Sequence, residues 1–254
     1  MFEIYNFGSG SGGNSTLVSD GKTQILIDLG LTLTRIKSGI KEAGYSIGDI
    51  AAVLVTHLHT DHFKPMLLNT FKPSLIFGSF FLKDNPDINL VFPFESFRVG
   101  TLNITPLQAS HDDVNVENTV GFRVENDLGE VLVYLTDTGF VPEENMELMK
   151  NADIYMIESN HDLHILHNES SYPPLTIERI DSDVGHLSNF DAAIATFYVC
   201  GPSTKQIVLL HLSIENNRPS LALQEFNRVF SVDLKKRDIK IDCAHPEKVT
   251  RFKW

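Results

Sequence analysis

The residues that could perform chemistry are concentrated in one short stretch, Thr56 to His62, which holds three histidines and one aspartate. Neutral imidazole nitrogen and carboxylate oxygen are ligands that Zn²⁺ and similar divalent ions accept. His57 and His59 are two residues apart, so their side chains point the same way in an extended segment. Asp61 and His62 follow on a turn, where they can face a second ion. The stretch therefore predicts a metal site rather than a polar loop that is rich in histidine by chance.

A buried strand is expected to deliver these side chains, because the apolar run at residues 51–55 directly precedes them. A polar group that leaves water without a partner costs on the order of 2–7 kcal/mol, and a metal ion is the natural partner for this set. Asp28 ends another expected strand, at residues 23–28. Its carboxylate either orients a metal-binding histidine or serves as a helix N-cap or loop carboxylate. The loop of small residues at 8–14 lacks the lysine of a phosphate-binding loop and is expected to pack near the metal site.

Strands and helices alternate along the rest of the chain, and polar residues gather at the carboxyl ends of the strands. His111, Asp137 and His211 each end or follow an expected strand. His164 and His167 are expected in a solvated loop without a functional role. Apolar periodicity predicts helices at residues 32–43, 63–71, 143–150, 190–199 and 219–230.

The composition describes a globular chain. Its 254 residues fit one large α/β domain or two small ones, and a hydrophobic content of 42% is enough for a sizeable core. A formal net charge of −12 disfavours electrostatic capture of a long stretch of duplex nucleic acid, although it does not exclude a phosphodiesterase. No signal peptide is recognisable at the start, and no apolar run approaches the roughly 18 residues of a membrane span. With only two cysteines, Cys200 and Cys243, a disulfide framework is not expected, and free thiols in a reducing, cytoplasmic compartment are. Neither belongs to a C-x-x-C motif, so neither is expected to bind a structural zinc ion.

The spacing H-x-H-x-D-H at residues 57–62 resembles the signature of the metallo-β-lactamase fold hydrolases. This resemblance implies an α/β fold, a four-layer αβ/βα sandwich in a single domain over residues 1–254. It also implies two divalent ions per chain, zinc or manganese, between which the sequence does not choose. The resemblance assigns His57, His59 and His111 to one ion and Asp61, His62 and His211 to the other, with Asp137 as the bridge.

Within this superfamily the chain resembles the YycJ/WalJ-type branch over nearly its whole length. The motifs that carry this resemblance are G-S-G-S-G-G-N-S at 8–15, E-S-N-H-D at 158–162, G-H-L-S-N at 185–189 and H-L-S-I-E-N-N at 211–217. Several are also similar to tRNase Z, in which a Gly-His-Ser/Thr segment supplies a histidine outside the metal ligands. The chain lacks a long basic insertion like the tRNA-gripping arm of tRNase Z, which argues against tRNA processing.

Five side chains are candidates for catalysis or substrate binding. Asp61 is a candidate to take the proton of the nucleophilic water. His186 is the best candidate to protonate the leaving alkoxide or to clamp the phosphate, the alternative being a residue that merely precedes a helix. His161 and Asp162 either contact substrate or support the metal ligands, and Asn216 is expected to contact substrate with them.

The leading hypothesis for function is a metal-dependent phosphodiester hydrolase. In such a site two ions lower the pKa of a bridging water from 15.7 towards about 7, so that hydroxide forms near neutral pH. The YycJ/WalJ resemblance implies a nuclease that acts on DNA ends, 5′-3′ exonuclease-like. The alternative is a cyclic mononucleotide phosphodiesterase similar to phage anti-Pycsar proteins, because an acidic surface suits a small substrate better than a polymer. A β-lactamase, a thioester hydrolase or an inactive scaffold is less expected, and the oligomeric state, a homodimer included, stays open.

Overall fold

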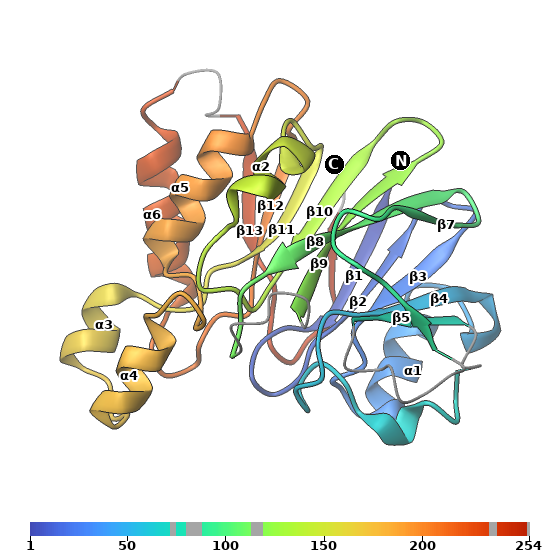
Figure 1. The fold of residues 1–254 in the computed structure, drawn as a ribbon, viewed down its shortest axis with the longest axis horizontal. Helices are drawn as coiled ribbons and strands as arrows, with labels where there is room; N and C mark the ends of the chain where they lie inside the picture. The colour runs from blue at the N-terminus through green and yellow to red at the C-terminus, as the bar shows by residue number, and fades with distance from the viewer. Residues whose placement is uncertain (72–74, 80–87, 113–118, 234–237, 253–254) are drawn as a thin grey trace. The chain divides into compact units, whose positions relative to one another are not determined.

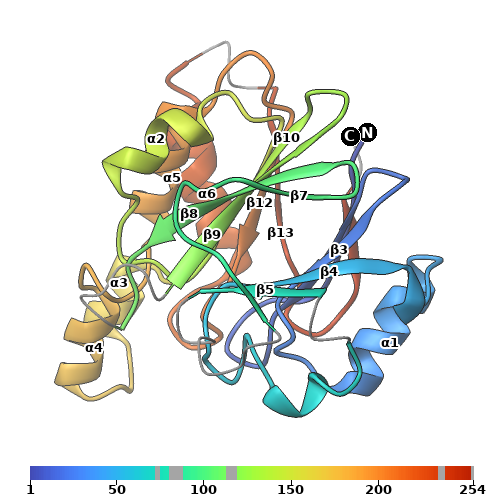
Figure 2. The same ribbon diagram turned by 45° about the vertical axis from the view of Figure 1, so that its right-hand side comes forward.

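Figures 1 and 2 show the computed structural model of the chain, which describes residues 1–71, 75–79, 88–112, 119–233 and 238–252. The chain divides into two compact units, each with a hydrophobic core of its own. The first unit comprises Met1–Pro106, Val124–Glu130 and Ala244–Trp254, and the second comprises Leu107–Arg123 and Val131–Cys243. No helix in the described part of the chain is long and apolar enough to cross a membrane.

The first of two mixed seven-stranded sheets has the strand order β14-β1-β2-β3-β4-β5-β6. Strands β14, β1, β2 and β3 pair antiparallel, whereas β3, β4, β5 and β6 pair parallel. The strands are β1 (Glu3–Gly8), β2 (Ser15–Ser19), β3 (Gln24–Ile27), β4 (Ile50–Val55), β5 (Ile76–Gly78), β6 (Asn89–Leu90) and β14 (Thr250–Phe252). Because β3 and β4 are parallel neighbours, Asp28 and the stretch that starts at Thr56 emerge at the same edge of this sheet.

Helix α1 (Leu33–Glu42) provides the crossover that connects the parallel strands β3 and β4. The side chain of Thr32 caps it by accepting a hydrogen bond from a backbone N–H of the first turn. Ile36 and Ile40 on its apolar face pack into the core of the first unit. Ala43 is the C-cap of the helix, and Gly44 follows it with a φ of 89°, a conformation that favours glycine at the end of a helix.

The second sheet has the strand order β13-β12-β11-β10-β9-β8-β7. Strands β10 to β13 pair parallel, and β7 and β8 pair antiparallel. The strands are β7 (Phe97–Val99), β8 (Leu102–Ala109), β9 (Thr119–Asn126), β10 (Val131–Leu135), β11 (Ile154–Glu158), β12 (Gln206–Leu210) and β13 (Lys240–Cys243). Strands β9 and β10 are neighbours joined by a tight turn, in which Gly129 N donates to Asn126 O at 2.9 Å.

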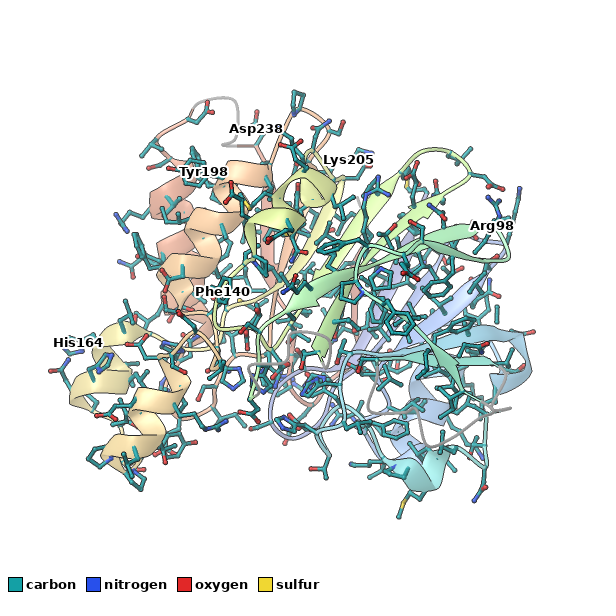
Figure 3. All side chains as sticks on the ribbon, in the orientation of Figure 1. Arg98, Phe140, His164, Tyr198, Lys205 and Asp238 are labelled. Atoms are coloured by element: carbon teal, nitrogen blue, oxygen red, sulfur yellow. The ribbon has the colours of Figure 1, made fainter. Side chains whose placement is uncertain are left out.

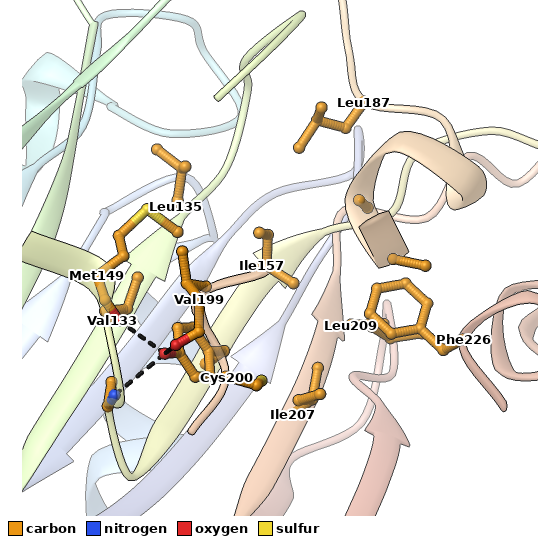
Figure 4. Close-up of a cluster of buried hydrophobic side chains, with 14 of the residues drawn as sticks. Val133, Leu135, Met149, Ile157, Leu187, Val199, Cys200, Ile207, Leu209 and Phe226 are labelled. Atoms are coloured by element: carbon orange, nitrogen blue, oxygen red, sulfur yellow. Dashed lines mark hydrogen bonds between the residues drawn. The ribbon is translucent and has the colours of Figure 1, made fainter. Parts of the chain in front are cut away.

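Helices α5 (Asn189–Val199) and α6 (Pro219–Phe230) lie side by side against the parallel strands of the second sheet, as both views show. Their apolar side chains, together with those of β10 to β12, form the buried cluster drawn in Figure 4. The Tyr155 hydroxyl in this cluster lies 2.6 Å from Met149 O and accepts a hydrogen bond from Ala152 N at 3.0 Å. These contacts tie the start of β11 to the end of α2 (Glu143–Met149). The predicted helices at 143–150, 190–199 and 219–230 are confirmed.

The predicted helix at residues 63–71 is wrong. Only Pro65–Leu67 forms a short 3-10 helix, although Phe63, Leu67 and Phe71 are buried as their spacing of four predicts. The backbone N–H groups of Leu67, Leu68 and Thr70 donate to carbonyls three residues back rather than four. Successive tight turns therefore bury the same side chains that a helix would bury, and periodicity does not distinguish the two.

The predicted loop around His164 and His167 is instead helix α3 (Leu163–Asn168), which precedes α4 (Pro174–Ile180). The side chain of Asp162 caps α3 by accepting a hydrogen bond from Ile165 N at 3.0 Å. An aspartate that precedes an apolar residue is a helix start signal, and the sequence interpretation missed it. The predicted solvation is confirmed, because His164, labelled in Figure 3, and His167 are both exposed.

Candidate metal-binding and catalytic residues

In the first unit, Asp28 organises the polar stretch that follows β4. It has a φ of 66°, which is uncommon for a residue other than glycine. Its buried carboxylate accepts hydrogen bonds from Thr56 N at 2.9 Å, Thr56 Oγ1 at 3.0 Å and His62 Nδ1 at 2.7 Å. Asp28 therefore orients a histidine, and the alternative of a helix cap is wrong because Thr32 caps α1.

The hydrogen bond to Asp28 also fixes which nitrogen of His62 is available. Nδ1 donates to the carboxylate, and Nε2 lies 3.6 Å from Asp61 Oδ2 and 2.8 Å from Asn14 Nδ2. Burial raises the pKa of Asp28, and the imidazole of His62 opposes that rise. Asn14 belongs to the loop of small residues, and its backbone N donates to Asp61 O at 2.7 Å. The prediction that this loop packs near the histidine-rich stretch is confirmed.

The other two histidines of the stretch pack in a row with His62: His57 lies against His62, and His59 lies against His57. The ring centroid of His57 is 4.2 Å from that of His62 and 4.6 Å from that of His59. His57 and His62 are buried, whereas His59 is exposed. Gly30 permits the close packing of this turn, since a Cβ there would lie 1.6 Å from Asp61 O. The first unit thus brings together all four residues predicted as ligands from this stretch.

In the second unit, three neighbouring parallel strands end in ionisable side chains. Asp137 follows β10, Glu158 ends β11 and His211 follows β12. The carboxyl ends of parallel strands meet at one edge of a sheet, which is where ligands bind in open α/β sheets. Asp137 and His211 have φ values of 55° and 53°. Strained backbone of this kind clusters at functional sites, so these two positions are site candidates on geometry as well as on residue type.

The side chains at this edge converge with His186, which precedes α5. Glu158 Oε1 lies 2.7 Å from His186 Nδ1 and 3.3 Å from His211 Nδ1. Asp137 Oδ1 lies 3.6 Å and 3.7 Å from the same two nitrogens. The ligand atoms of Asp137, Glu158, His186 and His211 all lie within 4.8 Å of one another, a grouping that could hold a metal ion.

Sequence reasoning did not single out Glu158, although the structure places it at the centre of this cluster. It is fully buried, and Oε2 accepts hydrogen bonds from Thr138 N at 3.0 Å and Leu187 N at 3.3 Å. Burial opposes its ionisation, but the imidazoles of His186 and His211 lower the pKa of Glu158 to about 2. The sequence signal that could have identified Glu158 is a carboxylate at the end of an otherwise apolar strand.

His111 follows β8 and is presented as a neutral ligand. Its Nδ1 donates to Gly185 O at 2.8 Å, and its Nε2 lies 3.8 Å from Asp137 Oδ1. Burial lowers the pKa of His111, and the Asp137 carboxylate opposes that change. Metal-binding histidines generally have one ring nitrogen hydrogen-bonded to an oxygen and the other turned to the ion. His62 and His111 both have this arrangement, and the N and O donor set without sulfur fits zinc or manganese.

The three residues predicted to contact substrate also belong to the second unit. His161 and Asn216 are buried, and His161 Nε2 lies 3.6 Å from Asp181 Oδ1. Burial lowers the pKa of His161, an effect that Asp181 opposes. Asp162 caps α3, and its backbone N donates to Asn216 O at 2.8 Å. These positions favour the alternative of a supporting role, and contact with substrate stays a prediction.

Comparison with known proteins identifies relatives over nearly the whole chain. Residues 23–212 match the family described as the beta-lactamase superfamily domain. The exodeoxyribonuclease WalJ of Streptococcus pneumoniae is 33% identical, covering 96% of this chain and 97% of the relative. The exodeoxyribonuclease YycJ of Bacillus anthracis is 32% identical, covering 87% of this chain and 86% of the relative.

Solved structures agree on the fold at lower sequence identity. The metallo-β-lactamase fold protein YhfI from Bacillus subtilis has a TM-score of 0.71 at 16% identity, with 99% of each chain covered. The short form of human tRNase Z has a TM-score of 0.66 at 16% identity, with 98% of each chain covered. The predicted α/β metallo-β-lactamase fold is confirmed, and its extent as one domain over residues 1–254 stays a prediction.

Proposed function

The chain belongs to the metallo-β-lactamase superfamily as a metal-dependent hydrolase, and we propose that it is a nuclease that cleaves phosphodiester bonds at DNA ends with 5′-3′ polarity. The observation that carries the proposal is the cluster of Asp137, Glu158, His186 and His211 at the carboxyl edge of parallel strands, in which all but the partly exposed His186 are buried. It pairs potential metal ligands with a histidine that a carboxylate holds for proton transfer. The two relatives named exodeoxyribonucleases support DNA as the substrate.

Seven side chains are proposed as ligands of two divalent ions, zinc or manganese. Such ions, when bound, lower the pKa of water and neutralise charge that develops on phosphoryl oxygens. His186 is left out of the ligands because the family resemblance on which the seven rest places this histidine outside them; its Nδ1 pairs with Glu158 Oε1 at 2.7 Å, which leaves Nε2 for proton transfer. The proposed ligands are His57, His59, Asp61 and His62 of the first unit and His111, Asp137 and His211 of the second.

His186 is proposed as the general acid. Glu158 orients the ring through Nδ1, so a proton on Nε2 is the one that can be transferred. As the P–O bond breaks, this proton passes to the leaving alkoxide oxygen. Asp61, whose side chain is 21% exposed, is proposed to accept the proton of the attacking water.

The test compares 5′-phosphorylated DNA with 3′,5′-cyclic mononucleotides, each with Zn²⁺ and with Mn²⁺. We expect release of mononucleotides from the DNA end and little turnover of the cyclic nucleotides. The alternative of a cyclic mononucleotide phosphodiesterase is favoured by the net charge of −12, and it would be supported by the opposite result. If neither substrate is hydrolysed with either metal, both the nuclease and the cyclic mononucleotide phosphodiesterase are contradicted.

A further inference from the structure

A pocket of about 520 Å³ in the second unit opens beside His186. Part of its lining is apolar and part is acidic, and no lysine or arginine is found among the described residues that line it. The apolar side includes Phe140, Met146 and Ile194, and the acidic side includes Asp181, Asp183 and Asp191.

This combination of charges disfavours phosphate as the occupant. A phosphate group in the pocket would meet several carboxylates, and among the described lining residues only His186 could carry a compensating positive charge. Like charges at close range repel strongly in a partly desolvated site. An uncharged flat group with apolar faces and N–H donors on its edge complements the same surface. In a nucleic-acid substrate this description fits the nucleobase.

Phe140 provides a fixed aromatic platform in the pocket. Its side chain is 40% exposed, and Figure 3 labels it. Its loop is held by hydrogen bonds from Thr138 N to Glu158 Oε2 at 3.0 Å and from Thr138 Oγ1 to Phe140 O at 2.5 Å. Gly139 packs closely against the backbone of Ser182, since a Cβ at position 139 would lie 2.2 Å from Ser182 O. A base that stacks on Phe140 therefore meets a surface that does not have to be ordered first.

Two of the three aspartates are already engaged in fixed contacts. Asp181 Oδ2 lies 2.7 Å from His167 Nε2, and Asp191 accepts a hydrogen bond from Ser188 Oγ at 2.6 Å. Asp183 is exposed in the loop that Gly139 contacts. Its exposed carboxylate belongs to the pocket lining, where it can accept a hydrogen bond from a group that enters the pocket.

We propose that this pocket binds the nucleobase of the leaving nucleoside, with one face stacked on Phe140 and an exocyclic amino group donating to Asp183. The assignment to the leaving side rests on the proposed function, in which His186 beside the pocket protonates the leaving alkoxide. Adenine, cytosine and guanine carry exocyclic amino groups, whereas thymine does not. The enzyme is therefore selective for a leaving nucleoside other than thymidine.

The first test measures binding without any metal, so that it does not depend on catalysis. Deoxyadenosine and inorganic phosphate are titrated separately into the metal-free protein, and binding is followed by NMR shifts. We expect deoxyadenosine to bind, Phe140→Ala to weaken it about tenfold, and phosphate not to perturb the pocket. Phe190→Ala is the matched control, because Phe190 is also 40% exposed in the second unit but does not line the pocket. Phosphate binding in place of deoxyadenosine, or equal effects of the two variants, would overturn the proposal.

The second test uses cleavage of short DNA substrates whose leaving nucleoside carries adenine, thymine or no base. We expect Phe140→Ala to lower kcat/KM about tenfold for adenine and to leave the abasic substrate unchanged. Asp183→Asn should abolish the preference for adenine over thymine, whereas Glu178→Gln, which removes the same charge outside the pocket, should not. An equal loss on all three substrates would mean that Phe140 is structural and would refute the pocket.

Bis(p-nitrophenyl) phosphate, a phosphodiester without a base, separates the two proposals. Suppose that the wild-type enzyme hydrolyses this compound and cleaves the three DNA substrates equally well. The proposal that the pocket binds a nucleobase would then be refuted, and the proposed function would stand. Absence of hydrolysis of every phosphodiester would refute the proposed function, and the metal-free titration would then decide the pocket by itself.

Discussion

Replacing Glu158 with glutamine tests the proton-transfer role of His186 with almost no change in side-chain volume. The two oxygens of Glu158 accept hydrogen bonds from His186 Nδ1 on one side and from Thr138 N and Leu187 N on the other. A glutamine amide has one acceptor oxygen, so its NH₂ group must face donors on one of the two sides. Leaving a buried donor unpaired costs about 1–3 kcal/mol, and we expect the free energy of unfolding to fall by about that amount.

The catalytic effect follows from the same contact. His186→Ala removes the proposed acid and should lower turnover of a DNA substrate by about 10²-fold or more, the usual scale for general acid catalysis. Glu158→Gln keeps the ring but weakens the contact that orients it, so we expect a loss of about tenfold or more. The double variant should be no slower than His186→Ala, because residues that act as one unit are not additive.

The assay compares two leaving groups and measures bound metal in the same samples. p-Nitrophenolate needs little protonation, so both variants should lose much less activity on bis(p-nitrophenyl) phosphate than on DNA. Metal content from elemental analysis should stay at the wild-type value in His186→Ala. His211→Ala is the contrasting control and should lose metal and activity together.

Two results would refute this reasoning. An equal loss on both leaving groups would mean that His186 clamps the phosphate and is not the acid. Unchanged turnover in His186→Ala would mean that the histidine is structural, and His161 would be the next candidate for the proton donor.

Four further predictions concern metal binding and stability. Elemental analysis should find up to two divalent ions per chain, and Asp137→Ala should lower that number; wild-type protein without transition metal after reconstitution would contradict the metal assignment. Asp28→Ala leaves buried donors unpaired and should lower the unfolding free energy in EDTA by about 1–3 kcal/mol or more, measured in urea. Cys200 and Cys243 should both react with a thiol reagent after unfolding, and a mass spectrum that shows them joined would refute the expected cytoplasmic location. Burial opposes ionisation of Asp20, but hydrogen bonds hold its pKa below the ordinary value. The ionised carboxylate therefore contributes stability above about pH 4, and this contribution is lost as the pH falls. Asp20→Asn should make the free energy of unfolding depend less on pH in acid titrations followed by circular dichroism.

The sequence by itself determined the superfamily and the kind of chemistry. Residues 57–62 supply imidazole and carboxylate groups at a spacing that depends only on neighbouring residues, so no tertiary information is needed to recognise the motif. Helix α1 with Gly44 after it, and the hairpin at Gly129, were equally predictable. In each case the determining interactions lie within a few residues along the chain, where local backbone preferences act.

Only the tertiary structure decided what the carboxylates Asp28 and Glu158 do. Asp28 bonds to His62, 34 residues away, and Glu158 bonds to His186, 28 residues away. Both pairs form because strand pairing and loop packing bring distant segments together at the edge of a sheet. The pocket beside His186 likewise combines loops and helices that are remote in sequence. A carboxylate at the end of a strand has several available partners, and long-range packing, which local spacing does not encode, selects the one it meets.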